Sequence, residues 1–165
     1  MQITVIGDSQ ADKEKYEFCM QLGRLLAEMN ITVITGGRSG VMEAVSKGAW
    51  ESGGLTVGIL PSDNKQTANP YCRIIIPTGL GHARNNITAL AADVVIVIGG
   101  QAGTLTEMGF AWIYEKPILA VVNFDGMSRK FGDQKLDSRG ENKIISVSSL
   151  DEIRTYLERF QSNFK

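Results

Sequence analysis

The feature that most constrains the fold is a run of β-branched residues that ends at two glycines. Val94–Ile98 is entirely apolar and too short to span a membrane, so it predicts a strand buried on both faces of a parallel sheet. Gly99 and Gly100 follow directly, and a helix is expected to begin near Thr104. A strand that leads through glycines into a helix leaves backbone N–H groups free for an anion. A turn that uses glycine only for close packing fits Gly99 and Gly100 equally well.

Two other predicted strands end at glycine in a similar way. The first, residues 3–6, ends at Gly7-Asp8-Ser9. The second, residues 31–34, leads into the turn Thr35-Gly36-Gly37-Arg38-Ser39-Gly40, after which another helix is expected. Ligands bind parallel α/β sheets beyond the carboxyl ends of the strands, where the strand order reverses. The three glycine-bearing strand ends should therefore lie together at one edge of the sheet.

Strands and helices alternate along the whole chain. Further strands are predicted at 55–60, 73–76, 118–122 and 144–147, and further helices at 13–29, 41–50 and 81–92 and from residue 149. The alternation predicts an α/β fold, a Rossmann-like doubly wound and mostly parallel sheet with helices on both faces. The 165 residues correspond to a single domain. Residues 123–142 are rich in Gly, Asp, Ser, Lys and Arg and are predicted to form an irregular loop.

Composition narrows the function classes. The formal net charge is −1 with no block of like charges, so no nucleic-acid or membrane surface is expected and a DNA-processing role is disfavoured. Cys19 and Cys72 form neither a CxxC pair nor a disulfide framework, and no signal peptide is recognisable, so we expect a cytoplasmic protein. The chain has one histidine and no cluster of cysteines or carboxylates, so no protein-ligated metal is expected.

The glycine turns match neither the GxGxxG dinucleotide fingerprint nor the GxxxxGK[ST] nucleotide loop. They resemble two motifs of the Lonely Guy superfamily, one at residues 35–49 and one similar to PGGxGTxxE. The second reads Gly99-Gly100-Gln101-Ala102-Gly103-Thr104-Leu105-Thr106-Glu107. The superfamily contains hydrolases that release the base from nucleoside monophosphates. Its relatives include molybdenum cofactor carrier proteins, which share the fold and the glycine motifs but bind a cofactor.

Three departures from the hydrolase pattern favour the carrier branch. Hydrolases have an Arg-Lys pair before the central strand, whereas here Arg84 is followed by Asn85. The proline of PGG is replaced by Ile98. After the strand at 118–122, residues 126–139 replace a longer apolar helical segment, and Leu136-Asp137-Ser138-Arg139 is similar to the carriers. The resemblance implies a non-enzymatic protein that holds the molybdenum cofactor, with a nucleoside 5'-monophosphate phosphoribohydrolase as the alternative.

The two charged residues of these motifs each allow two roles. Arg84 carries a fixed, forked charge that suits a phosphate, or it forms a surface ion pair with Glu107. The hydrolase resemblance implies that Glu107 is a base that orients water or a ribose hydroxyl. In the carrier interpretation Glu107 hydrogen-bonds a polar ligand without chemistry.

The remaining candidates are weaker signals. Thr104 and Ser39 offer hydroxyl groups to a ligand or cap their helices. Arg38 adds charge to the second glycine turn or is a solvated surface arginine. His82 is a neighbour of the site, and Asp8 is a candidate ligand contact. The predicted binding residues are Gly7, Ser9, Gly36, Gly37, Arg38, Ser39, Gly40, Arg84, Asn85, Gly99, Gly100, Gly103, Thr104 and Glu107.

The helix that begins near Thr104 also predicts self-association. Apolar groups lie almost all the way around it, at Met108, Phe110, Ala111, Trp112, Ile113 and Tyr114. An outer helix of a two-layer sheet needs only one apolar stripe, so a second face remains to be buried. Burial of both faces within one chain is the alternative. The resemblance also implies a homodimer, which can pair into a tetramer, with subunits meeting near the glycine motif.

Overall fold

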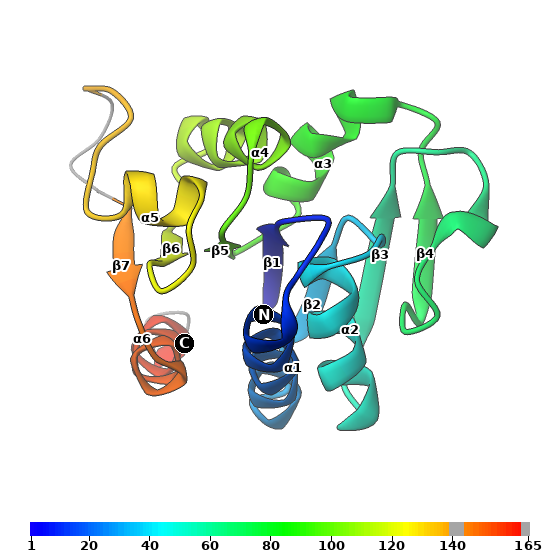
Figure 1. The fold of residues 1–165 in the computed structure, drawn as a ribbon, viewed down its shortest axis with the longest axis horizontal. Coiled ribbons are helices and arrows are strands. Elements are labelled where there is room, and N and C mark those ends of the chain that lie inside the picture. The colour runs from blue at the N-terminus through cyan, green and yellow to red at the C-terminus, as the bar shows by residue number, and fades with distance from the viewer. Residues whose placement is uncertain (139–143, 163–165) are drawn as a thin grey trace.

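The computed structural model describes residues 1–138 and 144–162 and shows the predicted doubly wound α/β fold (Figure 1). Within these residues, seven parallel strands form one sheet in the order β4-β3-β2-β1-β5-β6-β7. The strands are β1 (Gln2–Gly7), β2 (Thr32–Thr35), β3 (Thr56–Leu60), β4 (Ile74–Pro77), β5 (Val94–Ile98), β6 (Ile118–Val121) and β7 (Ile145–Val147). The helices are α1 (Lys13–Glu28), α2 (Val41–Glu51), α3 (Asn85–Leu90), α4 (Ala102–Ile113), α5 (Met127–Phe131) and α6 (Leu150–Ser162), with 3-10 turns η1 (Lys65–Thr67) and η2 (Gly81–Arg84).

The strand order reverses at β1, which lies between β2 and β5. The chain first builds β1 to β4 toward one edge, then returns through α3 to place β5 on the other side of β1 (Figure 1). Gly7 at the end of β1 pairs with Ile98 at the end of β5. Because the paired strands are parallel, β1, β2 and β5 all end at the same edge of the sheet. The prediction that the strand ends at Gly7, Gly36 and Gly99 lie together is confirmed.

Helices cover both faces of the sheet. One apolar core joins α1, α2 and α6 to the strands, and the second joins α3, α4 and the α5 region to the opposite face. Every residue of β5 is buried, so this strand is apolar because it has a core on each side. Burying each of its Val and Ile side chains stabilises the fold by roughly 1.5–3 kcal/mol. No helix among the described residues is long and apolar enough to cross a membrane.

Two segments differ from the sequence prediction. The predicted helix at 81–92 is divided into η2 and α3, since the first turn is wound more tightly, as is common at helix N-termini. The predicted irregular loop at 123–142 contains α5, so that prediction was wrong for Met127–Phe131. This short helix is held by contacts from outside it, because the Ser128 hydroxyl donates to the Val121 carbonyl at 2.7 Å and accepts from the distant Gly99 N–H at 2.9 Å. Arg139 and residues 140–142 lie outside the described residues.

Two glycines let α1 and α2 pack backbone against backbone. A Cβ on Gly48 would lie 1.9 Å from the carbonyl oxygen of Met20, and a Cβ on Gly23 would lie 2.1 Å from that of Val45. Neither carbonyl is the end of a flexible side chain, so a larger residue requires the helices to separate. The start of α2 is held beside the end of β1 separately, because the Val41 N–H donates to the Asp8 carbonyl at 3.0 Å.

We expect Gly48→Ala to destabilise the protein by about 1–3 kcal/mol, because the added methyl group overlaps backbone of α1. Gly109→Ala in α4 is the matched control, since a Cβ there would meet nothing within 4 Å. The control should stabilise the fold by up to about 1 kcal/mol through helix propensity. Urea denaturation measures both variants. Equal free energies of unfolding for the two would contradict the close packing of α1 on α2.

Candidate functional site

A cleft of about 760 Å³ opens where β1, β2 and β5 end. Its lining comes from the loop after β1, the turn after β2, η2 and the first turns of α1 and α4. This is the position at which doubly wound sheets bind ligands. Of the predicted binding residues, those that line the cleft are Gly7, Ser9, Gly36, Arg38, Arg84, Asn85, Gly103, Thr104 and Glu107. Asp8 and His82 line it as well.

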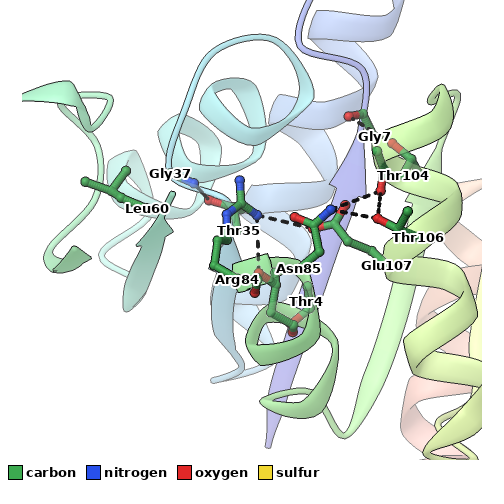
Figure 2. Close-up of polar contacts among 12 residues, drawn as sticks. Thr4, Gly7, Thr35, Gly37, Leu60, Arg84, Asn85, Thr104, Thr106 and Glu107 are labelled. Atoms are coloured by element: carbon green, nitrogen blue, oxygen red, sulfur yellow. Dashed lines mark hydrogen bonds and ion pairs between the residues drawn. The ribbon is translucent and has the colours of Figure 1, made fainter. Parts of the chain in front are cut away.

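Arg84 and Glu107 form an ion pair inside the cleft (Figure 2). Nη1 of Arg84 lies 3.3 Å from Oε1 of Glu107 and 3.2 Å from the hydroxyl of Thr88. The side chains are only 9% and 10% exposed, so this is not the surface ion pair considered from the sequence. Desolvation offsets much of the attraction in a buried pair, which makes the pair weak evidence for a purely stabilising role.

Arg84 keeps donors that the protein does not use. Its Nε is buried and has no hydrogen-bond partner among the described residues. No hydrogen bond within the described part of the chain involves Nη2 either. The guanidinium lies against Gly36, where a Cβ would come within 2.6 Å of Nη2 and 2.7 Å of Nη1. Glycine at position 36 thus makes room for a forked cation whose unused donors suit an oxyanion.

Burial shifts the pKa values of this pair in opposite directions. It raises the pKa of Glu107 to about 7, although the nearby positive charge of Arg84 opposes the shift. Burial also lowers the pKa of Arg84, which the carboxylate of Glu107 opposes and the charge of Arg38 increases. Near neutral pH, Glu107 therefore exists in both protonation states. A carboxyl group of this kind can exchange a proton with a bound ligand.

The turn at Gly99 and Gly100 is packed under the loop before α5 and does not line the cleft. The Gly99 N–H donates to the hydroxyl of Ser128 at 2.9 Å. The carbonyls of Gly99 and Gly100 accept from the N–H groups of Ser128 and Met127, each at 3.0 Å. Positive φ angles of 62° and 96° require glycine at these two positions. Gly99 and Gly100 therefore fit the second role considered from the sequence, a turn that uses glycine for close packing.

The start of α4 offers unpaired backbone N–H groups beside the cleft. Its N-cap, Gln101, makes no side-chain capping bond, and the first helical bond runs from Leu105 to the Gln101 carbonyl. The N–H groups of Gly103 and Thr104 are therefore left for an anion. A Cβ on Gly103 would meet nothing within 4 Å, so the fold itself does not demand glycine there. The Thr104 hydroxyl does not cap the helix and donates to the Gly7 carbonyl at 3.4 Å.

Only part of the second glycine turn lines the cleft. Gly36 and Arg38 line the cleft. The others, Gly37, Ser39 and Gly40, pack against neighbouring segments. The Ser39 hydroxyl donates to a carbonyl of the loop after β1 at 2.9 Å. A Cβ on Gly40 would lie 2.4 Å from another carbonyl of that loop. These residues hold the loop after β1 in place.

Asn85 connects α3 to α4 (Figure 2). Its side-chain amide donates to the hydroxyl of Thr106 at 2.7 Å and to the carbonyl of Gly103 at 3.3 Å. Both acceptors belong to the first turns of α4. Asn85 therefore orients the start of α4, and its amide nitrogen is already engaged on the side of the cleft where hydrolases have a lysine.

The sequence prediction did not include several residues that line the cleft from α1, the first turn of α2 and the flanking loops, namely Gln10, Lys15, Met42, Gln101 and Asp125. Lys15 is the most informative, because its Nζ lies 2.6 Å from Oδ2 of Asp8. Its position was available from the sequence. A helix that begins just after the loop from β1 must place part of its first turn beside the strand ends. Within residues 1–138 and 144–162, no three His, Cys, Asp or Glu side chains are arranged to hold a metal ion.

Fold and site together define a Rossmann-like α/β protein with a charged cleft at the point where the strand order reverses. The chain belongs to the SLOG cluster4 family, whose sequence model matches residues 1–154. This result confirms the resemblance to the Lonely Guy superfamily.

Solved structures of similar proteins cover almost the whole chain. The molybdenum cofactor binding protein from Rippkaea orientalis is 37% identical, with a TM-score of 0.84 over 99% of this chain and 97% of its own. The molybdenum cofactor carrier protein from Chlamydomonas reinhardtii is 29% identical, with a TM-score of 0.83 over 98% of each chain. A cytokinin riboside 5'-monophosphate phosphoribohydrolase from Arabidopsis thaliana is 31% identical over 73% of this chain, which spans 57% of that enzyme's length.

The raised pKa of Glu107 predicts how stability changes with pH. The folded-state value of about 7 lies above the ordinary value of 4.5, so the folded protein binds this proton more tightly than the unfolded chain. The resulting stabilisation is complete below the unfolded pKa and is lost as pH rises through the folded pKa. Glu107→Gln cannot titrate. As pH rises from about 4.5 to 7, the free energy of unfolding of Glu107→Gln should therefore increase relative to that of wild type. Urea denaturation at several pH values measures this difference. A difference that does not change with pH would contradict the raised pKa.

Proposed function

We propose that this protein is a carrier for the molybdenum cofactor, and that the cofactor's phosphate binds beside Arg84 in the cleft. The observation that carries the proposal is the pair of unused donors on Arg84, held against Gly36 at the end of β2. The free N–H groups at the start of α4 add further donors for the same anion. The likeness to two proteins named for the molybdenum cofactor over nearly the whole chain supports this choice of ligand.

The residue after Arg84 favours binding without hydrolysis. In the hydrolases that this chain resembles, an Arg-Lys pair supplies two cations at this point. Here Asn85 is neutral, and its amide nitrogen donates hydrogen bonds to two residues of α4. One cation with free donors is sufficient to hold a phosphate, so the cleft fits a ligand that is carried unchanged.

A phosphoribohydrolase acting on nucleoside 5'-monophosphates is the second candidate. One observation favours it, namely the pKa of Glu107, which burial raises to about 7. A general base or acid works best when its pKa is near the working pH. Glu107 also lies beside Arg84, and the hydrolase resemblance implies that these two residues act together.

Binding measurements test the role of Arg84. We expect Arg84→Ala to weaken binding of the molybdenum cofactor and of inorganic phosphate by about 1.5–3 kcal/mol, the scale of a lost charge-assisted hydrogen bond. Arg24→Ala is the control, because Arg24 forms an exposed ion pair on α1 away from the cleft lining. Isothermal titration calorimetry gives both affinities. Equal affinities for wild type and Arg84→Ala, with the fold intact, would assign Arg84 to a structural ion pair.

Turnover measurements separate the two candidate functions. The carrier should release no adenine from adenosine 5'-monophosphate, and Glu107→Gln should change only the affinity for the ligand. Chromatography of the reaction mixture detects free adenine directly. Release of adenine by wild type that Glu107→Gln abolishes would overturn the carrier and establish the hydrolase.

We also propose that the protein self-associates through the outer side of α3 and α4. Within the chain, α4 buries Met108, Ala111 and Trp112, so part of its apolar surface is covered internally. Ile113 on α4 remains 50% exposed, and Leu90 on the adjoining α3 is 52% exposed. Neighbouring exposed apolar side chains on packed helices are typical of a subunit interface.

Light scattering coupled to size-exclusion chromatography tests this interface. We expect a dimer or tetramer at micromolar concentration, and Ile113→Glu should shift the mass toward the monomer because it places a charge in the interface. Leu55→Glu is the control, since Leu55 is similarly exposed (42%) but precedes β3. A strictly monomeric wild type would show that the exposed side of α3 and α4 is free.

A further inference from the structure

A second ion pair lies in the cleft, on the opposite side of β1 from Arg84. Nζ of Lys15 is 2.6 Å from Oδ2 of Asp8, and the two side chains are only 13% and 16% exposed. Both residues line the cleft. The pair lies against Gly99, where a Cβ would come within 2.2 Å of Oδ2 and 3.1 Å of Nζ. Gly99 therefore makes room for this pair at the end of β5, as Gly36 does for Arg84 at the end of β2.

The Asp8–Lys15 pair has hydrogen-bonding capacity to spare. Oδ1 of Asp8 accepts no hydrogen bond from the described residues, and Nζ of Lys15 uses one of its three donors. Nζ also lies 5.6 Å from the centre of the Phe124 ring, which helps to fix its position. A partly buried pair contributes little net stability, so the position of these two charges in the cleft is better explained by a ligand that uses the free sites.

The two pairs lie on opposite sides of β1, which favours an extended ligand. Arg84 lies against the end of β2 and Asp8–Lys15 against the end of β5, with β1 between them. Two strand spacings separate these ends by about 10 Å. A phosphate held by Arg84 lies toward the β2 side of the cleft, and a ligand that also reaches Asp8 and Lys15 extends past the end of β1. One molecule that does so must carry its phosphate at one end and a different group at the other.

The charge balance indicates the nature of that second group. The charges of Asp8 and Lys15 cancel, so the pair favours neither an anion nor a cation. It offers one acceptor and further donors side by side, which matches a neutral ring edge with N–H groups next to a carbonyl oxygen. The 2-amino-4-oxopyrimidine half of a pterin has such an edge. We propose that Asp8 and Lys15 form the subsite for the pterin end of the ligand, an assignment that rests on the proposed carrier function.

The test compares ligands that share a phosphate but differ in the ring. Affinities of 6-hydroxymethylpterin phosphate, adenosine 5'-monophosphate and ribose 5-phosphate are measured by calorimetry for wild type, Asp8→Asn and Lys15→Gln. Both variants should lose about tenfold or more in affinity for the pterin phosphate, the effect of a lost hydrogen bond to a charged group. Their affinity for ribose 5-phosphate should stay within about twofold of wild type, because Arg84 is unchanged.

Controls and contrary outcomes separate this subsite from the proposed function. Glu51→Gln breaks an exposed ion pair that also involves α1 and should leave all three affinities unchanged. Thermal unfolding confirms that each variant is folded. Unchanged pterin-phosphate affinity in both variants, or an equal loss for ribose 5-phosphate, would overturn the subsite alone. A wild type that binds the pterin phosphate no better than ribose 5-phosphate would overturn the carrier function. A selective loss for adenosine 5'-monophosphate would overturn the pterin assignment.

Discussion

The absence of a side chain at Gly36 and Gly99 is the constraint on which the cleft depends. Each glycine follows a strand that flanks β1, and each lies in contact with a charged group that a Cβ would displace. Arg84 occupies the first space and the Asp8–Lys15 pair occupies the second. Charged side chains can therefore approach the carboxyl ends of strands that are buried in the core. Their charges are balanced within the protein by Glu107 and by each other.

Most glycines of the two motifs thus make room for neighbouring groups or hold adjacent segments in place, and few of them face the cleft. Gly99 and Gly100 carry the start of α5, since their carbonyls accept its first N–H groups. Ser39 and Gly40 secure the loop after β1. The donors left unpaired in the cleft belong instead to Arg84 and to the start of α4. The motif residues that face the cleft and those that support it are interleaved in sequence, because a tight turn exposes only part of its backbone on one side.

Arg84 has two possible partners in the cleft, the carboxylate of Glu107 and a bound anion. Its Nη1 is bonded to Glu107, and its remaining donors are free. When Glu107 is protonated, it loses its negative charge and no longer forms an ion pair with Arg84. The guanidinium is then available to an anion. The same arrangement can serve a carrier or a hydrolase, and the difference lies in the surroundings. Asn85 contributes to the position of α4 and adds no charge to the cleft.

Sequence alone determined the fold class, the common edge of the glycine-bearing strands and the presence of Arg84 and Glu107 in one site. The fold class and the common edge follow from local patterns, because a β-branched run, a glycine turn and a helical period each specify an element, and parallel strands share an edge. The pairing of Arg84 with Glu107 was implied by the resemblance to the Lonely Guy superfamily. The division of the glycines between cleft and interior was decided only by the tertiary structure. So were the burial of the Arg84–Glu107 pair and the helix α5. Each depends on what packs against a residue from a distant segment, and that information is not contained in local sequence patterns.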